Sequence, residues 1–180
     1  MTSTSNAQHS ILHELDSAFG DVSYPGDTAL AASRPSEWDS TLRRLCGKRW
    51  REVTAEDFDS QDGLVGSVQA LSLKGLVYFL PGLVRIALTD STARYAVVDA
   101  LVSRFTCPDH LPESCGFEKE VIAALSATRR DFLARFLAEM EKVEPHFCPV
   151  LIESAIANLR NGDVKSYRHE DVQKWAAKSG

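Results

Sequence analysis

The sequence has 180 residues, of which 44% are hydrophobic and 25% are charged. These proportions exclude a fibrous or intrinsically disordered chain and indicate a globular protein with a substantial core. The formal net charge of −5 argues against general nucleic-acid binding, because lysine and arginine supply most of the affinity for phosphate.

The sequence predicts a cytosolic protein. Residues 1–9 are polar and lack the basic and apolar regions of an export signal, so they are predicted to form a short tail. The most apolar stretch, 64–88, is interrupted by Lys74, Pro81 and Arg85, which favours a buried helix over a membrane span. Four cysteines in a chain of this kind indicate reduced thiols.

Apolar side chains recur at helical spacing along most of the chain, which predicts a mostly α fold. Residues 10–180 are expected to form one bundle-like helical domain. Its helices are expected over 10–19, 35–46, 72–89, from a cap at Asp90 or Ser91 to Phe105, over 117–143 with a break at Ser126, over 149–161 and around Val172 and Trp175.

Three shorter features complete the predicted fold. Pro81-Gly82 predicts that the central helix is kinked or splits into two abutting helices. Thr54 is expected to cap a turn of helix that holds Phe58. Residues 63–67 are predicted to form a loop, and a minor β element is expected near Trp50 or over 65–71.

Five candidate metal ligands lie on either side of the long 117–143 helix. Thiolate and imidazole are the ligands that zinc prefers. The candidates are Cys107, His110, Cys115, His146 and Cys148. Their spacing is not that of a tight zinc motif, so ordinary thiols and loop histidines are the favoured alternative. A Cys/His nucleophilic pair would also need an orienting group, which the sequence does not show.

Two charged blocks follow each other in the first third of the chain. The basic block surrounds Trp50 and consists of Arg43, Arg44, Lys48, Arg49 and Arg51. The acidic block consists of Glu52, Glu56, Asp57, Asp59 and Asp62. Mutual surface pairing is one interpretation, and it would add little stability. The other makes the acidic block a docking face for a basic protein partner, because complementary charge sets register.

Three short motifs occur in order along the chain. They are Ala18–Asp27 (AFGDVSYPGD), Gly47–Val53 (GKRWREV) and Tyr78–Gly82 (YFLPG). Over residues 11–142 this pattern, with a looser match at 125–137, resembles a bacterial family known as a domain of unknown function. The resemblance implies a bacterial cytosolic protein, brings no catalytic residues and leaves residues after about 145 outside the pattern. The aromatic motif residues are also of the kind that anchors a core.

No dinucleotide-binding, phosphate-loop, zinc-protease or nucleophile-elbow motif occurs in the sequence. The favoured function is therefore a non-catalytic protein-binding protein that sequesters a basic partner, as an immunity protein or antitoxin sequesters a toxin. No cofactor and no membrane partner are expected. One alternative is a metal-dependent enzyme or zinc-stabilised domain built on the cysteine and histidine loops. The other is a weak nucleic-acid binder acting through residues 43–51, which the neighbouring acids disfavour.

Overall fold

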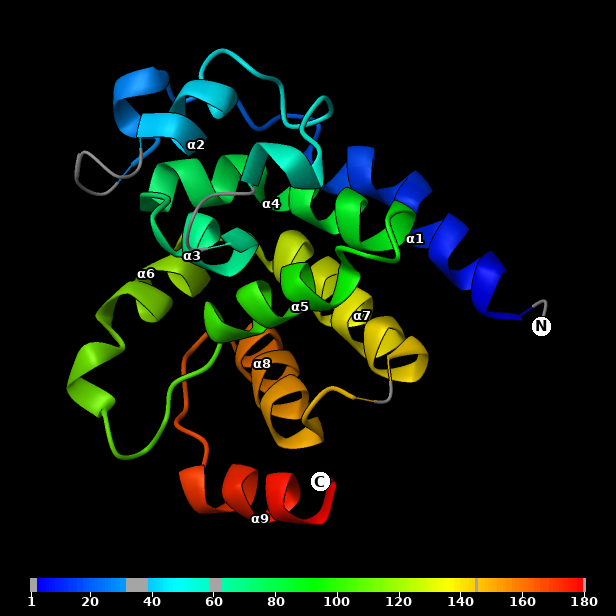
Figure 1. The fold of residues 1–180 in the computed structure, drawn as a ribbon, viewed down its shortest axis with the longest axis vertical. Coiled ribbons are helices and arrows are strands. Elements are labelled where there is room, and N and C mark those ends of the chain that lie inside the picture. The colour runs from blue at the N-terminus through cyan, green and yellow to red at the C-terminus, as the bar shows by residue number, and fades with distance from the viewer. Residues whose placement is uncertain (1–2, 32–38, 59–62, 145, 180) are drawn as a thin grey trace. The chain divides into compact units, whose positions relative to one another are not determined.

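A computed structural model describes residues 3–31, 39–58, 63–144 and 146–179 (Figure 1). Over these ranges the regular elements are α-helices and short 3-10 helices, so the predicted mostly α fold is confirmed. The chain divides into two compact units, Leu12–Leu101 and a second formed by Met1–Ile11 with Val102–Gly180. The single domain expected over residues 10–180 stays a prediction.

The unit Leu12–Leu101 is organised around one long apolar helix. Its elements, with the two helices that continue past its ends, are α1 (Ser3–Phe19), η1 (Asp27–Ala29), α2 (Asp39–Leu45), η3 (Ala55–Phe58), α3 (Gly63–Gln69), α4 (Leu73–Thr89) and α5 (Arg94–Ser103). Most of the side chains of α4 are buried. The Ser72 hydroxyl caps α4 by accepting a hydrogen bond from the Gly75 N–H at 3.0 Å.

Helix α4 continues through Pro81 as a single element, so the predicted alternative of two abutting helices is wrong. Packing on most of its faces compensates for the backbone hydrogen bond that a proline cannot donate. The helix is the most apolar of the chain but has 17 residues. No helix in the described ranges is long and apolar enough to cross a membrane.

Three local predictions differ from the structure. Helix α1 begins at Ser3, so residues 3–9 are helical and not a tail, because a nucleated helix extends at little cost. Residues 63–69 form α3 and not a loop. The minor β element is reduced to a bridge between Ala31 and Leu71. Helix α2 begins at Asp39, and the first part of the helix expected over 35–46 lies outside the described residues.

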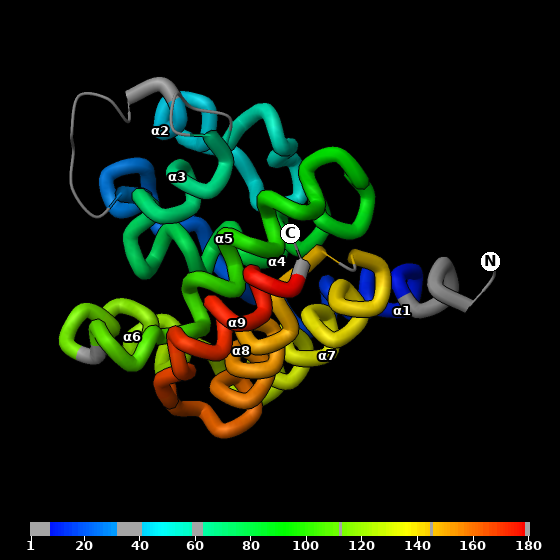
Figure 2. The backbone as a smooth tube through the Cα atoms, turned by 60° about the horizontal axis from the view of Figure 1, so that its bottom comes forward, coloured from blue at the N-terminus to red at the C-terminus, as the bar shows by residue number. Residues whose placement is uncertain are grey.

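The second unit contains a packed pair of antiparallel helices. Its elements after α5 are η4 (Pro112–Ser114), α6 (Gly116–Ala124), α7 (Ala127–Val143), α8 (Pro149–Asn161) and α9 (His169–Ser179). Helices α7 and α8 lie side by side, and α9 lies near α8 (Figures 1 and 2). Their core includes Phe132, Phe136, Leu137, Ile152 and Leu159, all of which are buried.

The predicted boundaries of these helices are confirmed. Ser126 separates α6 from α7, and its hydroxyl accepts a hydrogen bond from the Arg129 N–H at 3.3 Å. Pro149 is the first residue of α8, where a proline has no hydrogen bond to lose. Gly162 ends α8 in the left-handed conformation, with φ 71°, which favours glycine.

Candidate functional site

The first two motifs meet in the unit Leu12–Leu101. The Tyr24 hydroxyl donates a hydrogen bond to the Asp27 carboxylate. The Gly47 N–H donates to both side chains, at 2.8 Å to Tyr24 Oη and 3.0 Å to Asp27 Oδ1. Gly47 follows α2 with φ 70°, so the chain turns at this point and exposes its N–H to the pair. The turn at residues 24–27 therefore holds the start of the second motif.

The third motif lies on α4 and contacts the same segment. The Tyr78 ring meets the Tyr24 ring edge-on, with centroids 5.1 Å apart, and the Tyr78 hydroxyl donates to the Lys48 carbonyl at 3.3 Å. Two turns further along α4, the Arg85 guanidinium donates to the Val53 carbonyl. Carbonyls at both ends of residues 48–53 are thus bonded to one helix. The three motifs that carry the family resemblance form one connected structure.

Asp57 is a buried structural residue and not part of an exposed acidic face. Asp57 is only 6% exposed. Oδ1 lies 2.6 Å from Lys48 Nζ, and Oδ2 accepts the Thr54 N–H at 2.9 Å. A carboxylate withdrawn from water needs such partners, and it satisfies them within its own unit. Asp57 therefore does not belong to an exposed docking face, as the sequence had suggested. Asp59 and Asp62 lie outside the described residues.

Several charges of the two blocks contact groups of the same unit. Arg51 lies 2.7 Å from Asp16 and places its guanidinium over the Trp50 ring, 4.2 Å from the centroid. Arg44 donates to the Glu56 carbonyl at 2.6 Å, and the Glu52 carboxylate accepts the N–H of Arg49 at 3.1 Å. Arg51 pairs with an acid outside the acidic block, and the contacts of Glu56 and Arg49 use their main-chain atoms. Beyond the pair Lys48–Asp57, mutual pairing of the two blocks therefore stays an interpretation. Asp16 was not selected from the sequence, because its partner is 35 positions away.

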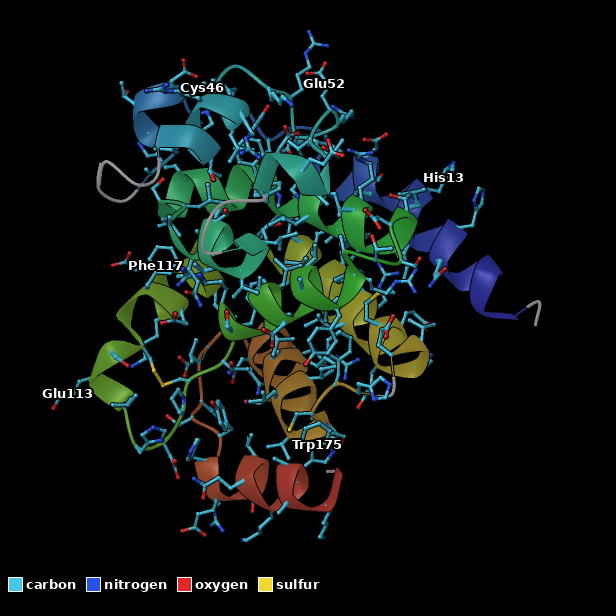
Figure 3. The ribbon with its side chains drawn as sticks, viewed as in Figure 1. His13, Cys46, Glu52, Glu113, Phe117 and Trp175 are labelled. Atoms are coloured by element: carbon cyan, nitrogen blue, oxygen red, sulfur yellow. A yellow bond between two sulfur atoms is a disulfide. The ribbon has the colours of Figure 1, made fainter. Side chains whose placement is uncertain are left out.

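The exposed charged side chains of the two blocks define a surface, which we name the 43–56 surface. It consists of Arg43, Arg44, Arg49, Arg51, Glu52 and Glu56. Glu52 points away from the ribbon in Figure 3. The surface has both signs of charge, and the backbone that carries it is bonded to Tyr24, Asp27 and α4. The backbone of this surface is therefore anchored at Gly47 and Lys48.

The structure changes the interpretation of the predicted metal ligands. Cys107 and Cys115 form a disulfide, visible as a yellow bond in Figure 3, with Cα atoms 5.7 Å apart and each residue 2% exposed. Reduced thiols were therefore a wrong prediction for these two, because the loop folds back through η4 and brings them within bonding distance. A sulfur bonded in a disulfide is not a thiolate ligand.

The other predicted ligands are not grouped into a site of three or more ligands in the described ranges. Cys148 is buried at the start of α8, and His146 is exposed. His110 contacts His169, with ring centroids 4.4 Å apart. Within the described ranges, no three histidine, cysteine or acidic side chains are grouped to hold a metal ion. His169 was missed from the sequence, because nothing local relates it to a residue 59 positions earlier.

The fold and this site define a mostly α protein with a rigidly held, mixed-charge surface. In comparisons with known proteins, no family model, no curated protein and no solved structure matched the chain. The resemblance to a bacterial family of unknown function therefore stays a prediction from the three motifs.

The Tyr24 phenol is expected to ionise at a higher pH than an ordinary tyrosine. Burial and the hydrogen bond to Asp27 raise the pKa of Tyr24 from 10.0 to about 12. Because the folded pKa lies above the unfolded one, this contribution to stability is complete below pH 10 and is lost as the pH rises towards 12. Burial also raises the pKa of Tyr167. Tyrosinate absorbance should therefore show a late step that Tyr24→Phe makes smaller. Tyr95→Phe, at an exposed position, should leave that step in place. An unchanged late step in Tyr24→Phe would contradict the assignment.

Proposed function

We propose that the protein is a non-catalytic protein-binding protein that contacts its partner through the 43–56 surface. The observation that carries the proposal is the anchoring of this charged segment to Tyr24, Asp27 and α4. A surface fixed before binding loses less conformational entropy when a complex forms. Fixed charges also select a partner with complementary charges and set its register.

The chemistry beneath the surface supports binding over catalysis. Cys46 is a free thiol of this segment. Four groups with acid–base potential each bond the backbone or a neighbouring side chain, and they are Tyr24, Asp27, Asp57 and Tyr78. A catalytic constellation instead directs such groups at a common point where a substrate atom can lie. Here their shared effect is to hold residues 47–57 in place.

The partner that fits this surface is a protein with charges of both signs. Its acidic groups would face Arg43 and Arg49, and its basic groups would face Glu52 and Glu56. The withdrawal of Asp57 into the unit reduces the acidic face expected from the sequence. An immunity-like role against a toxin remains our proposal for the biological setting, with a partner whose contact face is mixed and not uniformly basic.

The test is isolation of the tagged chain from its bacterial host, followed by native mass spectrometry of the wild type and of Glu52→Lys/Glu56→Lys. A matched control, Glu120→Lys/Glu153→Lys, reverses two exposed acids in the other unit and changes the net charge equally. We expect a stoichiometric protein partner with the wild type and the control. We expect it to be lost with the variant at the 43–56 surface.

The second candidate partner is a nucleic acid bound through Arg43–Arg51. The direction in which binding changes in Glu52→Lys/Glu56→Lys distinguishes it from a protein partner. Replacing two acids with lysines would strengthen binding to phosphates, because each added cation can neutralise one more. Nucleic acid that copurifies and increases in Glu52→Lys/Glu56→Lys would overturn the proposal. A chain without a partner, or a partner retained equally by both variants, would also overturn it.

A further inference from the structure

The loop that contains the disulfide is fastened to the C-terminal segment of its own unit. The Tyr167 N–H donates to the Cys107 carbonyl at 2.9 Å, and the Asp109 N–H donates to the Tyr167 carbonyl at 3.0 Å. Next to this pair, the Asp109 carboxylate accepts the His169 N–H at 3.1 Å. Loop and segment are therefore held together by backbone contacts at the point where α9 begins.

These contacts place two imidazoles against each other. The rings of His110 and His169 are tilted by 56°, and their centroids are 4.4 Å apart. The His110 side chain is 49% exposed, so water reaches the pair. Asp109 adds a carboxylate, with Oδ1 3.9 Å from His110 Nδ1. The two histidines come from segments that are separated by most of the unit's sequence, and the backbone holds both.

The spacing of the rings is close to that of two imidazoles on one metal ion. A zinc–nitrogen bond of about 2.0 Å puts each ring centre about 3.2 Å from the metal, so a tetrahedral angle separates two centres by about 5.2 Å. The observed 4.4 Å would have to increase by only about 0.8 Å. Half-exposed side chains can make such a change by rotation, without movement of the backbone.

We propose that His110 and His169 form a binding site for a divalent transition metal, with Zn²⁺ as the representative ion. The two imidazoles are its protein ligands, and water fills the other positions, which agrees with the lack of a third grouped ligand in the described ranges. The carboxylate of Asp109 contributes negative charge beside the cation. The bound metal would join the disulfide loop to the start of α9, and this site is independent of the 43–56 surface.

The site differs from the zinc site predicted from the sequence. That prediction required thiolates from Cys107 and Cys115, which are paired with each other. The proposed site keeps His110 and replaces the sulfur ligands with His169. Binding should therefore survive removal of the two cysteines, which gives the experiment a direct way to separate the two sites.

The experiment is calorimetric titration of the full, oxidised chain with Zn²⁺ alone, in a buffer without chelator. We expect one equivalent to bind. His169→Asn and His110→Asn should each weaken binding at least tenfold, with circular dichroism showing that both variants remain helical. His13→Asn, at an exposed histidine of α1, should bind as the wild type does (Figure 3). Cys107→Ser/Cys115→Ser should also keep its affinity.

Three results would overturn the proposal. Unchanged affinity in both His169→Asn and His110→Asn would show that the pair is not the site. Loss of binding in His13→Asn would place the metal on α1 instead. Loss in Cys107→Ser/Cys115→Ser, with affinity kept in His169→Asn, would restore the cysteine site that the sequence suggested.

Discussion

Alanine at position 82 is expected to lower the free energy of unfolding by about 3 kcal/mol, although Gly→Ala usually stabilises a helix. A Cβ atom on Gly82 would lie 2.5 Å from Val53 Cγ2 and 2.6 Å from the Trp50 carbonyl oxygen. The Val53 methyl can move aside. The Trp50 oxygen belongs to the main chain, so α4 or the segment above it would have to shift.

Gly116→Ala is the matched control for this prediction. Gly116 is the first residue of α6, whereas Gly82 lies inside α4, and nothing lies within 4 Å of a Cβ added to Gly116. Its stability should change by less than about 1 kcal/mol, and in the favourable direction if at all. Urea unfolding followed by circular dichroism measures both variants. Equal midpoints for Gly82→Ala and Gly116→Ala would show that α4 does not hold the second motif at this position.

Gly82 also explains why the third motif contains a glycine after its proline. The helix and the segment at Trp50 approach too closely for any side chain between them. Earlier on the same helix, the Tyr78 ring contacts Tyr24 and the Phe79 ring lies edge-on to Phe58, with centroids 6.0 Å apart. If the 43–56 surface is the binding site, Gly82→Ala should weaken partner binding without altering an exposed charge.

Local signals in the sequence predicted several helix ends in the second unit. Ser126 and Gly162 act within three or four residues of themselves, through a capping hydrogen bond and a left-handed turn. Such contacts are set by the chain's immediate neighbours. The ion pair between Asp131 and Arg135 is of the same local kind, since the two residues lie four apart on α7 with Nε and Oδ2 3.1 Å apart.

The candidate site was harder to predict, because its contacts join distant parts of the chain. Composition alone made Asp57 one of five equivalent acids, yet it is buried against Lys48 and Thr54. The spacing of Thr54 and Asp57 is that of a capping box, and it could have distinguished this acid from its neighbours. The pairing of His110 with His169 had no local signal, since it depends on how residues 164–169 return to the loop.

The second large effect is expected at Asn158, where alanine should cost about 3 kcal/mol in the free energy of unfolding. Asn158 is 1% exposed on α8. Its Nδ2 donates to the carbonyls of Phe105 and Lys165, at 2.9 Å and 3.2 Å, and its Oδ1 accepts the Lys165 N–H at 2.9 Å. Alanine removes three hydrogen bonds and leaves their backbone partners in a space that water reaches poorly. Each such bond contributes about 1 kcal/mol net.

The consequence of Asn158→Ala extends to the proposed metal site. Asn158 bonds the chain just before Cys107 and just before Tyr167, so it fixes both segments that carry the histidine pair. Its loss should weaken Zn²⁺ binding as well as lower the unfolding midpoint in urea, although no ligand is changed. Asn161→Ala, at the exposed end of the same helix, should alter stability by less than about 0.5 kcal/mol. If the two alanine variants unfold at the same urea concentration, the buried amide does not organise this unit, and the histidines must be held by the loop and its disulfide alone.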